Sequence, residues 1–113
     1  MNWYLVKITY RILCGKGDHI PQFDEQLRLV SAGNEMLALA KAKMLGESGS
    51  QAFFNDAQQL VQWQFIDITD LYCISEWVDG AEVYSSITEA DNADAYINLV
   101  TDKATMLHHR HLS

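Results

Sequence analysis

The alternation of apolar and polar side chains over residues 4–14 constrains the fold more than any other feature of this sequence. The intervening odd positions include Lys7, Thr9 and Arg11. The even positions are Tyr4, Val6, Ile8, Tyr10, Ile12 and Cys14. Successive side chains of a strand point to opposite faces of its sheet, so this pattern predicts a strand with one buried face. The chain must therefore build its core on a sheet.

A second alternating segment, residues 22–32, has Phe23, Leu27 and Leu29 on one side. The two segments are separated by a loop that contains two glycines around a lysine. A phosphate-binding loop needs a particular glycine spacing and a following helix, whereas a strand follows here. The loop is therefore predicted to be the tip of a hairpin.

Residues 34–45 are rich in Ala, Leu, Met and Lys and contain no β-branched residue, a composition that favours a helix. Asn34 is a suitable N-cap and Gly46 a suitable stop. Leu37, Ala40 and Met44 share one face. We expect a short helix that packs on the sheet.

The segment after this helix is predicted to add strands. Residues 51–54 are a candidate short strand before a turn at Asn55 and Asp56. The apolar phase then changes near residues 65–67, which predicts a bulge or bend there. Asp79 and Gly80 suggest a tight turn, so residues 60–87 are expected to form a second hairpin.

Residues 88–111 place apolar side chains on one helical stripe, with acidic residues first and basic residues last. We predict a single α+β domain over residues 1–113. Its antiparallel sheet has four to five strands in the order β-β-α-(β)-β-β-α, with a C-terminal amphipathic helix. Residues 1–87 form its core, and residues 88–113 form the helix and a His-rich tail.

Composition excludes several classes of function. With 113 residues, 49% of them apolar, the chain can bury one core. A net charge of -7 and a pI near 4.8 oppose nucleic-acid binding. No run is long enough to span a membrane and no secretion signal is evident, so we expect a soluble cytoplasmic protein. Cys14 and Cys73 are expected to be buried free thiols, with a bridge only if the protein is exported.

Few residues are candidates for chemistry. Asp18, His19, Asp24 and Glu25 in the first hairpin are candidate ligand-binding residues, with Tyr10 or Tyr72 as a further candidate, although such side chains are usually solvated. His108 and His111 lie three residues apart and can approach one metal ion, but no third ligand is specified. We predict no metal site, no cofactor and no catalytic residue.

Several strand and turn motifs together resemble a family of small bacterial proteins catalogued as a domain of unknown function. The motifs are NWYLVKITYRI, FDEQLRLVSAGNEMLALAKA, VQWQFIDITDLYCI and DGAEVYSSI. The resemblance covers about the first 87 residues and leaves out the C-terminal helix. It implies a small α+β domain and supplies no catalytic residues.

The sequence thus favours a non-enzymatic interaction protein that forms a homodimer or another homo-oligomer. The interface is predicted on two apolar surfaces, made by Trp3, Leu5, Tyr96, Ile97, Val100 and Leu107. If both sheet faces carry apolar residues, the second needs a cover, either the C-terminal helix or another subunit. Two alternatives remain: a small-molecule-binding protein or enzyme with a pocket near the first hairpin, and an acidic partner that neutralises a basic protein such as a nuclease toxin.

Overall fold

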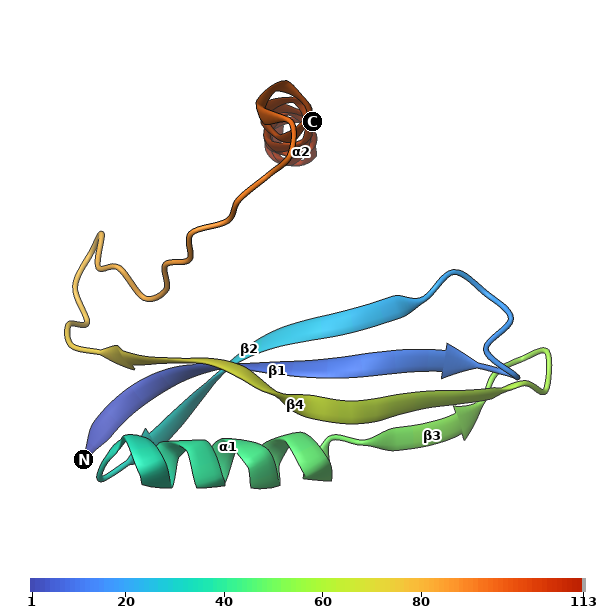
Figure 1. Cartoon of the computed structure of the whole chain (residues 1–113), viewed down its shortest axis with the longest axis horizontal. Helices are drawn as coiled ribbons and strands as arrows, with labels where there is room; N and C mark the ends of the chain where they lie inside the picture. The colour runs from blue at the N-terminus through green and yellow to red at the C-terminus, as the bar shows by residue number, and fades with distance from the viewer. Residues whose placement is uncertain (113) are drawn as a thin grey trace.

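The computed structural model describes residues 1–112, with side chains described for residues 1–110. Its elements are β1 (Asn2–Cys14), β2 (Gln22–Ala32), α1 (Glu35–Ser48), β3 (Gln51–Phe54), β4 (Leu60–Ile74) and α2 (Ala93–Leu112). The strands form one antiparallel, curled sheet in the order β2-β1-β4-β3, and α1 covers one face (Figure 1). The predicted α+β class and an antiparallel sheet of four strands are confirmed, with the elements in the order β-β-α-β-β-α.

The even face of β1 is the centre of the core, as its alternation predicted. Val6 and Ile8 are fully buried and Tyr10 is 1% exposed. Val30 and Ala32 from β2, and Ala38 and Ala42 from α1, pack in the same cluster. Since these residues occupy the middle strand, its neighbour and the covering helix, the hydrophobic effect holds the sheet and α1 together.

The helix α1 begins where the sequence predicted but packs through a different face. The Asn34 side chain accepts a hydrogen bond from the Leu37 backbone N–H at 2.9 Å, which confirms the N-cap. The buried residues of α1 are Ala38, Ala42 and Gly46. The predicted face is wrong, because Leu37 and Met44 are 55% and 72% exposed.

Gly46 does not end α1, contrary to expectation. The helix continues to Ser48 and is capped by Gly49. A Cβ atom on Gly46 would overlap the ring of Phe65, so the glycine is required for close approach of helix and sheet. The Tyr10 hydroxyl also donates a hydrogen bond to the Gly46 carbonyl at 2.8 Å.

Two β-bulges in β4 explain its change of apolar phase. The register against β1 shifts between Lys7 and Ile8 and again between Thr9 and Tyr10. The extra residues are Ile66, inside the predicted range, and Thr69, which was not predicted. After each extra residue, the alternating side chains of β4 point to the opposite faces of the sheet from before. Phe65, Ile68 and Leu71 consequently all pack against the core cluster.

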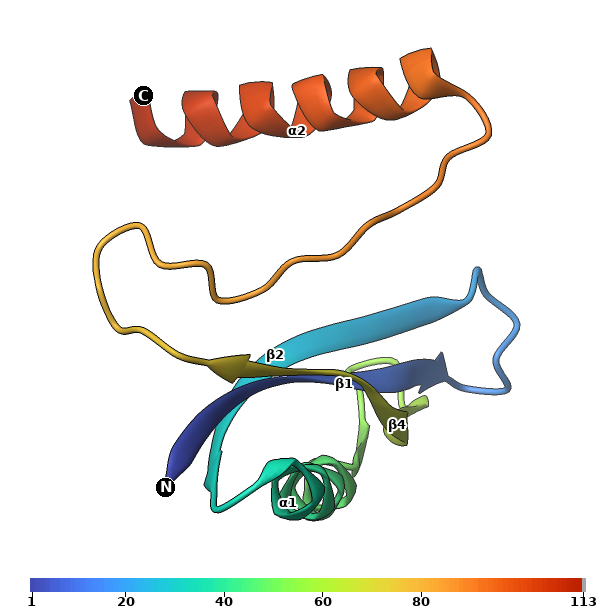
Figure 2. The same ribbon diagram turned by 60° about the vertical axis from the view of Figure 1, so that its left-hand side comes forward.

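The short strand β3 is confirmed, whereas the second hairpin is wrong. Asn55 forms the expected turn, because its side chain accepts hydrogen bonds from the N–H groups of Ala57 and Gln59, each at 3.0 Å. The Asp79–Gly80 turn also exists, with a hydrogen bond from Ala81 N–H to the Val78 carbonyl at 3.0 Å. Residues 81–87 nevertheless form no strand. They run in an extended path on the sheet face opposite α1 (Figure 2).

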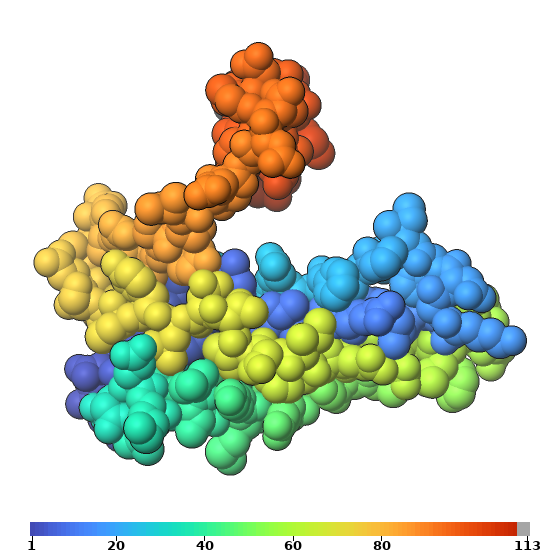
Figure 3. All heavy atoms as spheres, in the orientation of Figure 1, coloured from blue at the N-terminus to red at the C-terminus, as the bar shows by residue number. Residues whose placement is uncertain are grey.

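The helix α2 stands apart from the rest of the molecule. It has no contacts with the other described helices and strands. Figure 3 shows it raised above the sheet on the segment that follows β4. The radius of gyration is 17.7 Å, whereas a compact chain of this length has about 13 Å. Most of that excess reflects the detached helix.

Candidate functional site

The tip of the first hairpin contains a wide, open hollow of about 1040 Å³. Asp18 and His19 line it, together with Cys14, Lys16 and Gln59. Two of the four predicted ligand-binding residues therefore lie at one concave surface. Asp24 and Glu25 do not line it.

The imidazole of His19 is engaged by the backbone on both sides. Its Nε2 accepts a hydrogen bond from the Cys14 N–H at 3.0 Å, and its Nδ1 lies 2.9 Å from the Ile20 carbonyl oxygen. The first bond requires a bare Nε2 and the second a protonated Nδ1, so both are satisfied by one neutral tautomer. His19 thus stabilises the conformation of the loop. Both of its ring nitrogens are occupied by backbone contacts, so neither is free to transfer a proton or bind a metal.

Asp24 and Glu25 lie on opposite faces of β2. Asp24 is opposite Tyr10 on the face that holds the core, whereas Glu25 is opposite Thr9 on the other face. The Asp24 carboxylate accepts hydrogen bonds from Trp63 Nε1 at 3.2 Å and Gln26 Nε2 at 2.8 Å. Neither carboxylate forms an acid/base pair with His19.

Among the described side chains of residues 1–110, no group of three His, Cys, Asp or Glu is placed to hold a metal ion. His108 lies exposed near the end of α2, and the side chain of His111 lies outside the described ones. Cys14 and Cys73 are both free thiols. Cys14 is half-buried and Cys73 is exposed, so the prediction of two buried thiols is wrong.

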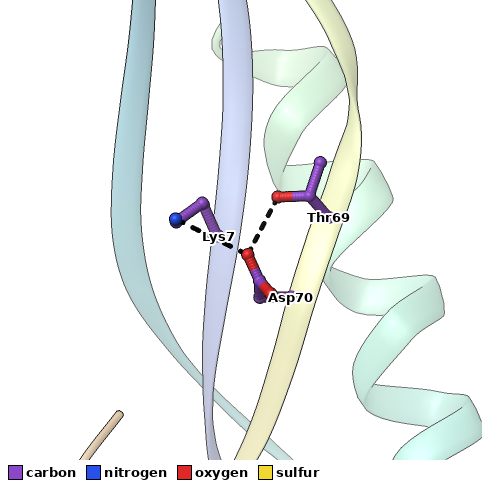
Figure 4. A network of polar contacts seen from close by, with 3 residues as sticks. All are labelled: Lys7, Thr69 and Asp70. Carbon is purple, nitrogen blue, oxygen red and sulfur yellow. Dashed lines mark hydrogen bonds and ion pairs between the residues drawn. The ribbon is translucent and has the colours of Figure 1, made fainter. Parts of the chain in front are cut away.

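The sheet face opposite α1 carries a polar cluster that the sequence did not reveal. Lys7 Nζ lies 3.6 Å from a carboxylate oxygen of Asp70, which also accepts a hydrogen bond from the Thr69 hydroxyl at 3.1 Å (Figure 4). Lys7 also lies 5.1 Å from the centre of the Tyr84 ring. A hydrogen bond with Tyr84 raises the pKa of Lys7. No sequence signal marks this cluster, because Thr69 is a bulge residue and Tyr84 comes from an irregular segment.

The same face contains Trp3 and Leu5, two predicted interface residues. The rings of Trp3 and Trp77 meet edge to face, with centroids 6.2 Å apart. Leu5 is only 9% exposed. Residues 75–87 of the same chain therefore lie over the part of this face around Trp3 and Lys7, where the sequence suggested the C-terminal helix or another subunit as the cover. Trp3 remains 44% exposed.

The other four predicted interface residues lie on α2 and are all half-exposed. Tyr96, Ile97, Val100 and Leu107 are 46%, 56%, 49% and 52% exposed. Ala93 and Ala104 belong to the same helical stripe. No other described helix or strand contacts the stripe.

These features define a class of protein: a small α+β domain with a curled antiparallel sheet, one covering helix and a detached amphipathic helix. The chain belongs to the family described as "Domain of unknown function (DUF4288)", whose model matches residues 3–85. No curated protein and no solved structure matches the chain. The matched residues contain all of the sheet except Asn2, and all of α1, whereas α2 lies outside them. Neither described helix is long and apolar enough to cross a membrane.

Proposed function

We propose that this protein is a non-enzymatic interaction domain that self-associates, with α2 as its principal contact. The observation that carries the proposal is a 20-residue helix that touches no other described element of its own chain. Isolated helices of about this length are only marginally stable in water, and most gain their stability from packing an amphipathic face. A partner that covers the apolar stripe would supply this stability.

The spacing of the stripe favours a second helix as that partner. Ala93, Ile97, Val100, Ala104 and Leu107 follow one another in alternating steps of four and three residues. This is the a/d pattern of a coiled-coil seam, in which side chains of one helix fit between those of another. The seam is short, which suits a reversible association.

The charges of α2 favour an antiparallel pair. Asp94 lies in the first turn, whereas Lys103, His109 and Arg110 lie in the second half. Two antiparallel copies would place the acidic start of each beside the basic end of the other, and would oppose their helix dipoles. In this arrangement Ile97 meets Leu107 of the second copy, and Val100 meets Ala104. A parallel pair would bring like charges together.

The proposal is tested by light scattering on the full chain at high micromolar concentration. Wild type is expected to be a dimer, and Val100→Glu to shift strongly towards monomer because it places a charge in the seam. Asn98→Glu is the matched control, since Asn98 lies on the opposite side of α2 and should leave the dimer intact. A monomeric wild type contradicts self-association. A monomer that captures a basic protein would instead support the neutralising role suggested by the net charge of -7.

A further inference from the structure

The outer edge of β2 is an unpaired sheet edge. β2 is the first strand in the order β2-β1-β4-β3, so its backbone pairs with β1 on one side only. It is 11 residues long. At one end, Lys41 Nζ from α1 donates a hydrogen bond to the Ser31 carbonyl at 2.9 Å. Residues 22–30 remain as an edge that can accept a further strand.

The side chains of this edge carry complementary charges in a regular order. On the face that holds the core, Gln26 Nε2 donates to Asp24 at 2.8 Å, and Arg28 Nη1 donates to Gln26 Oε1 at 3.0 Å. The strand therefore presents an acid, an amide and a base at successive positions of one face. When a second copy of the strand runs in the opposite direction, its base lies opposite the acid of the first strand, and its acid lies opposite the base.

We propose that β2 pairs antiparallel with β2 of a second copy, with Gln26 at the two-fold axis. In this register Asp24 faces Arg28 of the second copy on each side of the axis. An axis at Glu25 or Arg28 would oppose like charges, which destabilises a cross-strand pair. An axis at Leu27 would leave Asp24 and Arg28 without charged partners. The open edge of residues 22–30 is also centred on Gln26.

The apolar side chains on the opposite face of β2 are compatible with the same register. Phe23, Leu27 and Leu29 are 55%, 51% and 48% exposed. With Gln26 at the axis, Phe23 faces Leu29 of the second copy, so two apolar pairs form, whereas Leu27 faces Glu25. The strand pair would join the two sheets into one sheet of twice the width.

This inference rests on the proposed self-association and specifies how the two copies are arranged. The two-fold axis of an antiparallel strand pair is perpendicular to the sheet, and it reverses the direction of any element that lies along the sheet. Figure 2 shows α2 raised above the face opposite α1, with its axis running along the sheet. The axis at Gln26 would thus also make the two α2 helices antiparallel, the direction that their charges favour. A single two-fold axis is therefore compatible with both contacts.

The register is tested by cross-linking in a full chain whose Cys14 and Cys73 are replaced by serine. Gln26→Cys should form a disulfide-linked dimer under mild oxidation, because residues paired across antiparallel strands have Cα atoms about 4.5–5.5 Å apart. Arg28→Cys is the matched control. Its two copies would lie about 13 Å apart, beyond the reach of a disulfide. Equal rates of cross-linking, or no cross-link from Gln26→Cys, would overturn the proposal.

A charge exchange provides a second measurement. Asp24→Arg and Arg28→Asp should each weaken the homodimer at least about tenfold, because each opposes like charges. An equimolar mixture should restore dimerisation, as heterodimers visible by native mass spectrometry. Two folded variants that each dimerise as wild type would rule out this register. Asp24→Arg removes the acceptor of Trp63, so if it fails to fold, the cross-linking result decides.

The two proposals fail in different ways. A wild-type dimer that shows no Gln26→Cys cross-link, but is dissociated by Val100→Glu, would remove the β2 contact and keep α2 as the contact. A wild-type monomer without cross-links would remove both.

Discussion

At the scale of single residues, the contact of Gly46 with Phe65 decides how closely α1 approaches the sheet. Alanine is a better helix former than glycine by about 1 kcal/mol, but its Cβ atom would overlap the Phe65 ring. Overpacking typically costs about 1–3 kcal/mol. The ring is held edge to face against Tyr10, with centroids 6.0 Å apart, so it cannot move freely. The overlap should therefore dominate.

We predict that Gly46→Ala lowers the free energy of unfolding by about 1–2 kcal/mol. In a Phe65→Leu background the same substitution should be neutral or stabilising, because the overlap is gone and the helix propensity of alanine remains. Urea denaturation of the four proteins of this double-mutant cycle measures the coupling. Equal effects of Gly46→Ala in both backgrounds would show that the ring does not require the glycine.

Ionisation of the buried Tyr10 phenol should make the folded protein less stable at alkaline pH. Burial raises the pKa of its phenol above the usual value of 10.0. The unfolded chain therefore ionises Tyr10 at a lower pH than the folded protein does. Its contribution is fully present below about pH 10 and is lost as the pH rises towards the folded pKa. The raised pKa of Lys7 likewise lowers the free energy of unfolding as the pH rises.

We predict that the free energy of unfolding falls above about pH 10, and that the fall is shallower in Tyr10→Phe. At neutral pH this variant should cost only about 1 kcal/mol, because the Gly46 carbonyl keeps a hydrogen bond from the Gly49 N–H at 3.1 Å. Denaturant titrations at several pH values provide the comparison. Parallel pH profiles of wild type and Tyr10→Phe would contradict a contribution from this phenol.

At the scale of elements, periodicity predicted each strand of the sheet but not every face. The prediction that the even-numbered side chains of β1 are buried was correct, because one uninterrupted alternation runs through Tyr4, Val6, Ile8 and Tyr10. In β4 the change of phase predicted the bulge at Ile66. It did not predict the bulge at Thr69, because two changes of phase bring the pattern back to its first face.

The buried face of α1 could not be read from hydrophobicity alone. The helix places its small residues Ala38, Ala42 and Gly46 against the sheet and leaves Met36 and Met44 80% and 72% exposed. Large aromatic rings from β1 and β4 fill the space below α1, so only small side chains fit there. Complementary volumes across an interface are a property of the fold, and a single helix does not reveal them.

The candidate sites show the same limit. Sequence proximity grouped Asp18, His19, Asp24 and Glu25, but strand alternation sends Asp24 and Glu25 to opposite faces. His19 was recognisable only as a polar residue in a loop, because its backbone partners depend on the path of that loop. The stripe on α2 was predictable, since it depends on helical spacing within one segment.

At the scale of the whole molecule, the stability of the detached α2 should depend on association of two copies, whereas the stability of the core should not. The sheet and α1 contain the buried core, whereas α2 contributes none of the buried residues among the described side chains. The core should therefore keep its structure in the monomer. More than half of the helical residues lie in α2, with 20 residues against 14 in α1. Helix content is thus a sensitive measure of whether α2 is covered.

We predict that the helical circular-dichroism signal at 222 nm falls by roughly half when the full chain is diluted below its dissociation constant, because α2 loses its packing partner and becomes marginal in water. Trp63, which stacks on Phe53 with ring centroids 5.9 Å apart, should keep its near-ultraviolet signal because it lies in the sheet. Asn98→Glu should repeat the wild-type dilution curve. Val100→Glu should show the low helical signal at every concentration, because the charge in the seam prevents a second α2 from covering the stripe. A wild-type helical signal independent of concentration, in a sample that light scattering shows to dissociate, would mean that α2 is stable alone and that its apolar stripe does not drive the association.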